Sequence, residues 1–105
     1  MTENLFQPVT VQGGEPEQSI PAGRRSILQI RVDILRVVAQ GFGKPTQIMY
    51  KANLSWNVLQ AQLRSFVVAE MLTVEEYGSR RRYTITTRGA DLVRSYEKVV
   101  NEILN

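Results

Sequence analysis

The chain of 105 residues contains no cysteine and no histidine. It therefore has no disulfide and no thiolate nucleophile, and the usual nitrogen and sulfur ligands of zinc are missing. Histidine is also the commonest general base near neutral pH. Only two aspartates, Asp33 and Asp91, accompany the eight glutamates. We therefore expect no enzyme, and neither a metal nor a cofactor.

Long hydrophobic runs are absent as well. The apolar stretches are only a few residues long, far below the roughly 20 residues that a membrane span needs. The N-terminus has no basic region followed by a long apolar run, so no secretory signal is visible. The length suits about one domain. We expect a single cytoplasmic domain without membrane contact.

Positive charge is unevenly distributed. Residues 1–23 carry three glutamates and no lysine or arginine, whereas the whole chain has a net charge of +3. Residues 24–105 therefore carry a surplus of six positive charges. Ten of the thirteen cations are arginine, whose forked donors suit phosphate groups and guanine edges. This basic part favours a polyanionic partner.

The first 23 residues differ from the rest in composition. Proline and glycine interrupt them six times, and their apolar residues are sparse and aperiodic. We predict a flexible N-terminal tail over residues 1–23 and one folded domain over residues 24–105.

Helical periodicity begins at Ser26. Apolar residues recur at helical spacing from Ile27 to Val38, which predicts a helix over residues 26–40 that ends before Gly41. Pro45 suits the first position of a second, short helix. Asn53 tolerates a left-handed conformation, so it is expected to end that helix.

A third helix is predicted over residues 55–69, with Ser55 as its N-cap. Its apolar stripe consists of Leu59, Leu63, Phe66 and Val67. A turn of about three residues separates this helix from the short helix before it. This arrangement is that of a helix-turn-helix.

A β-hairpin is predicted over residues 72–85. Apolar and polar residues alternate on both sides of a turn at Tyr77-Gly78-Ser79. The alternation predicts that Leu72, Val74, Tyr83 and Ile85 face inward. Arg80, Arg81 and Arg82 stand beside the tip.

The last predicted helix covers residues 87–104 and is capped by Thr86. Its apolar stripe has the 4-3-4 spacing of a coiled-coil seam. The stripe either closes the domain core or contacts a second copy of the chain, and we favour a homodimer because the core already has many apolar residues. The expected interface consists of Leu92, Val93, Tyr96, Val99, Val100 and Ile103.

This order of elements predicts an α+β, mainly α, winged helix-turn-helix fold: three helices and a hairpin wing, followed by a dimerisation helix. In such a fold the third helix enters the major groove of double-stranded DNA, and the wing reaches the flanking backbone. The expected DNA-binding residues are Lys51, Asn53, Ser55, Trp56, Asn57, Gln60, Arg64, Arg80, Arg81 and Arg82.

Each of these features also has a simpler interpretation. Polar residues on an open helix face, such as Asn57 and Gln60, are often merely solvated. Glu75 and Glu76 would repel phosphate unless they pair with the arginines across the hairpin. Trp56 shields the turn, stacks on a sugar or fills the edge of the core, and the last of these is favoured.

The chain also resembles a known family. Four stretches of the sequence resemble archaeal winged-helix regulators of the ArnR-like kind. These stretches are Ile34-Leu35, Lys44-Pro45-Thr46-Gln47-Ile48-Met49-Tyr50, Ala52-Asn53-Leu54-Ser55-Trp56 and Arg82-Tyr83-Thr84-Ile85-Thr86-Thr87-Arg88-Gly89. They also resemble the small archaeal chromatin-type winged-helix proteins with an antiparallel coiled coil. The resemblance covers about residues 24–105 and implies homodimers that bind DNA without a catalytic cofactor. It departs at Glu70, where many relatives have glycine, and in a shorter last helix.

Three functions remain open at this stage. The first is a dimeric transcription regulator, located with the nucleoid in the cytoplasm. The second is an architectural DNA-binding protein with little sequence preference, and the third is a winged helix that binds other proteins. A large affinity ratio between one operator and random DNA would single out the regulator.

Overall fold

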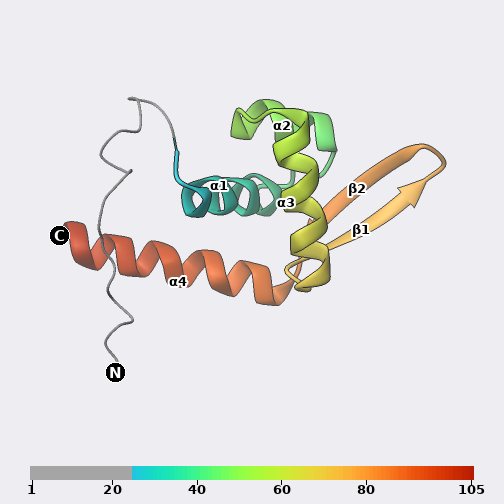
Figure 1. Ribbon diagram of the computed structural model, residues 1–105. Coiled ribbons are helices and arrows are strands. Elements are labelled where there is room, and N and C mark those ends of the chain that lie inside the picture. The colour runs from blue at the N-terminus through green and yellow to red at the C-terminus, as the bar shows by residue number, and fades with distance from the viewer. Residues whose placement is uncertain (1–24) are drawn as a thin grey trace, which may run out of the picture.

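The computed structural model describes residues 25–105, so the predicted tail over residues 1–23 lies outside the described part of the chain. Its elements, in chain order, are α1 (Ile27–Ala39), α2 (Pro45–Ala52), α3 (Trp56–Val68), β1 (Leu72–Tyr77), β2 (Arg80–Ile85) and α4 (Thr87–Leu104). Four helices and one antiparallel hairpin follow each other in the predicted order. The predicted winged helix fold is thus confirmed (Figure 1).

The helix ends follow from their local sequence. The side chains of Ser26, Ser55 and Thr86 each accept a hydrogen bond from a backbone amide in the first turn of the helix that follows. Each cap of this kind stabilises a helix by about 1 kcal/mol. Pro45 occupies the first position of α2, and Asn53 ends α2 with a φ of 57°. The predicted caps at Ser55 and Thr86 and the predicted turn at Asn53 are confirmed, whereas Ser26, predicted as the first helical residue, is itself a cap.

The core lies where α1 meets α2, α4 and β2, with α3 packed on β1. Its largest fully buried side chains are Phe66, Ile34, Leu35, Ile48, Leu59, Leu63 and Leu72. One detail of α1 differs from the prediction: Ile27 is 58% exposed, whereas Val32 is buried. Several elements surround α1, so its buried face is wider than one stripe, while its first turn lies at the end farthest from the hairpin (Figure 1).

The hairpin has the predicted orientation. Its register pairs Leu72 with Ile85 and Val74 with Tyr83. Leu72 and Tyr83 are buried, Val74 and Ile85 are half-buried, and the alternate residues on both strands are exposed. Toward the tip every residue is exposed, so the hairpin projects from the core into solvent (Figure 1).

The corner between α3 and the hairpin is built without glycine. Glu70 adopts a left-handed φ of 62°, and its carbonyl accepts a hydrogen bond of 2.8 Å from the hydroxyl of Thr86. The backbone amide of Thr86 also donates to the carbonyl of Met71 at 3.1 Å. The end of α3 and the start of α4 are therefore joined at the base of the wing.

The last helix lies beside α1 and runs past its first turn (Figure 1). Val93 belongs to the hydrophobic core of the single chain and is 8% exposed. This corrects its predicted place in a dimer interface, because α1 already covers this side of α4. By contrast, Leu92, Val99 and Ile103 are 45%, 54% and 75% exposed.

Candidate nucleic-acid interface

A close backbone approach brings the start of α2 next to the wing. The amide of Tyr83 donates a hydrogen bond of 2.8 Å to the carbonyl of Gly43. A Cβ atom at Gly43 would lie 2.4 Å from the carbonyl oxygen of Tyr83, so only glycine fits between the two chain segments. Lys44 and Pro45 follow directly in the chain and are thereby placed beside β2.

The result is an open groove of about 890 Å³ between the start of α2, the first turns of α3 and the wing. Its lining residues are Lys44, Pro45, Thr46, Trp56, Gln60, Tyr77, Ser79, Arg80, Arg81 and Arg82. Four of these ten side chains are cationic and none is acidic. The groove therefore offers positive charge together with polar donors and an aromatic ring, which suits a polyanion.

The acidic residues of the wing have partners on the wing itself. Glu76 lies 3.7 Å from Arg81 (Oε2 to Nε), as the cross-strand register predicts. Glu75 accepts a hydrogen bond from the hydroxyl of Tyr77. Within residues 25–105 no carboxylate lies within ion-pairing distance of Arg80 or Arg82. Arg80 and Arg82 therefore bring positive charge to the groove without an ion pair in this part of the chain.

The contact with Glu75 also shifts the pKa of Tyr77 at the wing tip. The hydrogen bond from Tyr77 to Glu75, and the negative charge of that carboxylate, raise the pKa of Tyr77 above its ordinary value of 10.0. The proton stays on the phenol oxygen of Tyr77, which donates it in a hydrogen bond to the Glu75 carboxylate.

Half of the predicted DNA-binding residues line this groove. They are Trp56, Gln60, Arg80, Arg81 and Arg82. Trp56 is 43% exposed and lines the groove wall, so a large part of its ring is accessible from the groove.

The other five predicted residues have different surroundings. Asn57 and Arg64 are exposed on α3 outside the groove, and Ser55 caps that helix. The ammonium of Lys51 lies 4.4 Å from the centre of the Phe42 ring. The carbonyl of Asn53 accepts a hydrogen bond of 2.6 Å from Arg25.

Sequence patterns alone missed the contribution of α2 and of the wing turn. The missed lining residues are Lys44, Pro45, Thr46, Tyr77 and Ser79. The available signal was Gly43, two residues before Pro45, since glycine is the usual residue where two backbone segments approach closely.

Metal ligands do not cluster in the part of the chain that the structure describes. Residues 25–105 contain no group of three or more acidic, histidine or cysteine side chains that could hold an ion. None of the helices in this range is both long enough and apolar enough to cross a membrane.

Solved structures with a similar fold come from archaea and bacteria. Sso10a-2, a DNA-binding protein from Sulfolobus solfataricus, has a TM-score of 0.63 and 24% identity over 76% of this chain and 86% of its own. The protein AF1382 from Archaeoglobus fulgidus has a TM-score of 0.65 and 17% identity over 73% and 90% of the two chains.

A third similar structure is the homodimeric winged helix-turn-helix DNA-binding domain of Mb0332 from Mycobacterium bovis, a possible ArsR-family transcriptional regulator. It has a TM-score of 0.61 and 20% identity over 80% of this chain and 94% of its own. No curated protein sequence matches the chain. A family model described as winged helix-turn-helix matches residues 24–104, so the chain belongs to the winged helix-turn-helix family.

Proposed function

We propose that this protein is a homodimeric transcription regulator that binds double-stranded DNA in the groove between α3 and the wing. The observation that carries the proposal is the convergence of Arg80, Arg81, Arg82 and Lys44 on one groove that also contains the start of α3. Cations on phosphates position a protein on the duplex, and side chains at base edges add sequence selectivity.

In this proposal α3 enters the major groove with its N-terminal turns. Gln60 lies on the wall of the groove and can pair bidentately with adenine. Trp56 stacks against the sugar-phosphate backbone, and Lys44 with the wing arginines neutralises phosphates along the groove beside α3. The predicted contacts of Asn57 and Arg64 belong to the same proposal, because both side chains are exposed on α3.

The proposed dimer forms through the exposed face of α4. Leu92, Val99 and Ile103 are at least 45% exposed in the single chain, and their spacing suits a coiled-coil seam. Burying such a stripe against a second copy removes apolar surface from water at about 25 cal/mol per Å². The similar domain from Mycobacterium bovis is homodimeric, which supports a homodimer here.

The experiment that tests this function is selection from a random duplex library with the purified chain. For a regulator we expect one enriched sequence, bound at least about 10³-fold more tightly than random duplex at the same salt concentration. A ratio below about 10 would instead favour an architectural DNA-binding protein. No binding at low salt would contradict both, and would favour a module that binds proteins.

A further inference from the structure

Few apolar contacts fix the direction of α4. Gly89 and Val93, both in the first two turns, are its only buried residues. Farther along the helix, polar contacts join it to α1. The hydroxyl of Tyr96 donates to Oε1 of Gln29 at 3.2 Å, and Nε of Arg36 donates to Oε2 of Glu97 at 2.7 Å.

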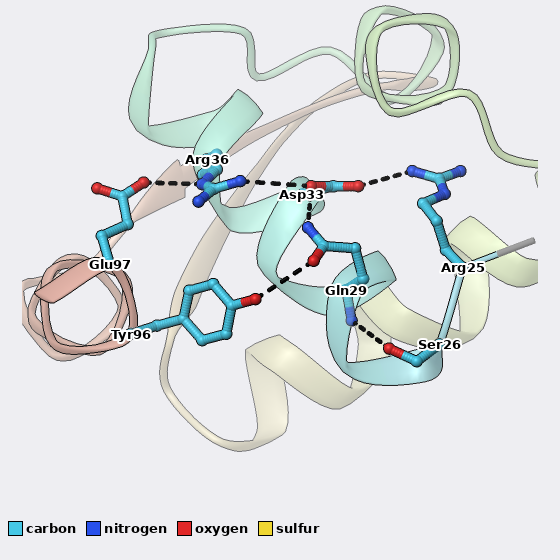
Figure 2. A network of polar contacts seen from close by, with 7 residues as sticks. All are labelled: Arg25, Ser26, Gln29, Asp33, Arg36, Tyr96 and Glu97. Atoms are coloured by element: carbon cyan, nitrogen blue, oxygen red, sulfur yellow. Dashed lines mark hydrogen bonds and ion pairs between the residues drawn. The ribbon is translucent and has the colours of Figure 1, made fainter. Parts of the chain in front are cut away.

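Asp33 orients both of the α1 side chains that make these contacts (Figure 2). Its Oδ1 accepts a hydrogen bond of 2.9 Å from Nε2 of Gln29 and lies 3.7 Å from Nη1 of Arg36. Gln29 then presents its carbonyl oxygen to Tyr96. One carboxylate thus holds the amide and the guanidinium in the rotamers that reach α4.

The other oxygen of Asp33 acts toward the helix-turn-helix. Its Oδ2 lies 2.8 Å from Nη1 of Arg25, and Nη2 of Arg25 donates to the carbonyl of Asn53 at 2.6 Å. Asn53 ends α2 and is three residues before the start of α3. A continuous set of polar contacts therefore connects the turn before α3 with α4. Figure 2 shows the part of this set from Arg25 to Tyr96 and Glu97.

We propose that Asp33 is a positioning residue that fixes the angle between α3 and α4, and thereby sets the spacing of the DNA half-sites that the dimer recognises. This inference rests on the proposed dimeric DNA-binding function. A small change in this angle moves the far end of α4 by a large distance, because α4 has 18 residues and is about 27 Å long. A tilt of about 10° at its base moves its far end by about 5 Å, more than the roughly 3.4 Å rise of one base pair.

The test compares Asp33→Asn with the wild-type protein on synthetic duplexes. Each duplex carries two copies of the half-site selected by the wild-type protein, with centres about 8 to 13 base pairs apart, and a further duplex carries one copy. For the wild type we expect at least about 30-fold tighter binding at the best spacing than two base pairs away. For Asp33→Asn we expect this ratio to fall below about fivefold, with affinity for the single half-site within about twofold of the wild type.

Two further variants keep the test decisive. Glu97→Gln removes the ion pair with Arg36 on a side chain that is 45% exposed, and it should broaden the spacing profile even if Asp33→Asn fails to fold. Asp91→Asn is the matched control, because it removes an exposed ion pair with Arg94 outside this set of contacts and should keep the wild-type profile.

An unchanged spacing profile in both Asp33→Asn and Glu97→Gln would overturn the inference. Equal losses of affinity on single and paired half-sites would also overturn it, since they indicate a purely structural role. A wild-type protein without spacing preference would overturn it too. In that case the single half-site titration shows whether DNA binding itself, and with it the proposed function, has failed.

Discussion

Glu70 holds a backbone conformation that glycine usually provides. Its φ of 62° is left-handed, and for a residue with a Cβ this costs roughly 1–2 kcal/mol. The corner still forms, because the carbonyls of Glu70 and Met71 both accept hydrogen bonds from Thr86. Glycine adopts this φ without strain, so Glu70 is a strained residue in an otherwise well-bonded corner.

Replacing this residue should stabilise the fold. We expect Glu70→Gly to raise the free energy of unfolding by about 0.5–1 kcal/mol, since relief of the left-handed strain exceeds the added chain entropy of glycine. Thermal unfolding followed by circular dichroism measures this, with a rise of about 3–6 °C in Tm. Glu102→Gly, in the exposed last turn of α4, is the control and should lower Tm slightly. A lower Tm for Glu70→Gly would contradict the strain argument.

Gly89 gives a residue-scale prediction of the opposite sign. A Cβ atom at this position would lie 2.4 Å from the carbonyl oxygen of Met71, which accepts the hydrogen bond from Thr86. We expect Gly89→Ala to lower the free energy of unfolding by at least about 2 kcal/mol, although alanine favours helices. Denaturant unfolding measures the change, with Ala90→Gly as the control in the same turn. A variant as stable as the wild type would contradict the close approach.

At the scale of elements, α4 is the part whose role depends on a partner copy. Val99 is 54% exposed in the single chain, so Val99→Glu leaves the fold intact while it places an unpaired charge in the proposed seam. We expect the dissociation constant of the dimer to rise by at least about 100-fold. Sedimentation equilibrium measures this constant.

The matched control for that variant is Asn101→Glu, an exposed position of α4 that lies off the 4-3-4 stripe. It adds the same charge and should leave the dimer intact. If Val99→Glu and the wild type sediment alike, whether both as monomers or both as dimers, the seam is wrongly placed.

The elements themselves were largely predictable, because their signals are local. Ser55 and Thr86 cap helices through their own first turns, and the register of the hairpin follows from its alternation. The burial of Val93 in the core of the single chain was not predictable. The apolar side of α4 is wider than one coiled-coil seam, and the sequence of the helix does not tell which part of that side faces α1.

The lining of the groove was predictable only in part, because local sequence signals do not reveal contacts between distant segments. The charged and amide side chains that α3 and the wing contribute to the groove can be recognised in the sequence. The α2 side of the groove exists because the carbonyl of Gly43 accepts a hydrogen bond from Tyr83, 40 positions away in the chain. Periodicity and turn signals do not contain a contact of this range, so Lys44 and Thr46 were missed.

At the scale of the whole molecule, the two proposed surfaces lie apart. The described residues measure 47 Å in their longest dimension, and the hairpin and the C-terminus of α4 lie at opposite ends of the molecule (Figure 1). DNA binding and dimerisation can therefore be altered separately. Variants in the wing should change DNA affinity without changing the dimer, and variants in the α4 stripe should change the dimer directly.

In the proposed complex, the groove between α3 and the wing binds the DNA backbone. The most direct measurement is the salt dependence of affinity for a random duplex, between about 50 and 200 mM salt. It compares the wild type with an Arg80→Gln, Arg81→Gln, Arg82→Gln triple variant. A control variant, Arg88→Gln, Arg94→Gln, Lys98→Gln, removes three charges from α4 instead.

We expect the wing variant to lose about two to three units from the slope of log affinity against log salt, since each phosphate contact contributes about 0.9. The α4 variant should retain a slope close to that of the wild type. A wing variant with the wild-type slope, or an equal loss in both variants, would contradict the claim that this groove binds DNA.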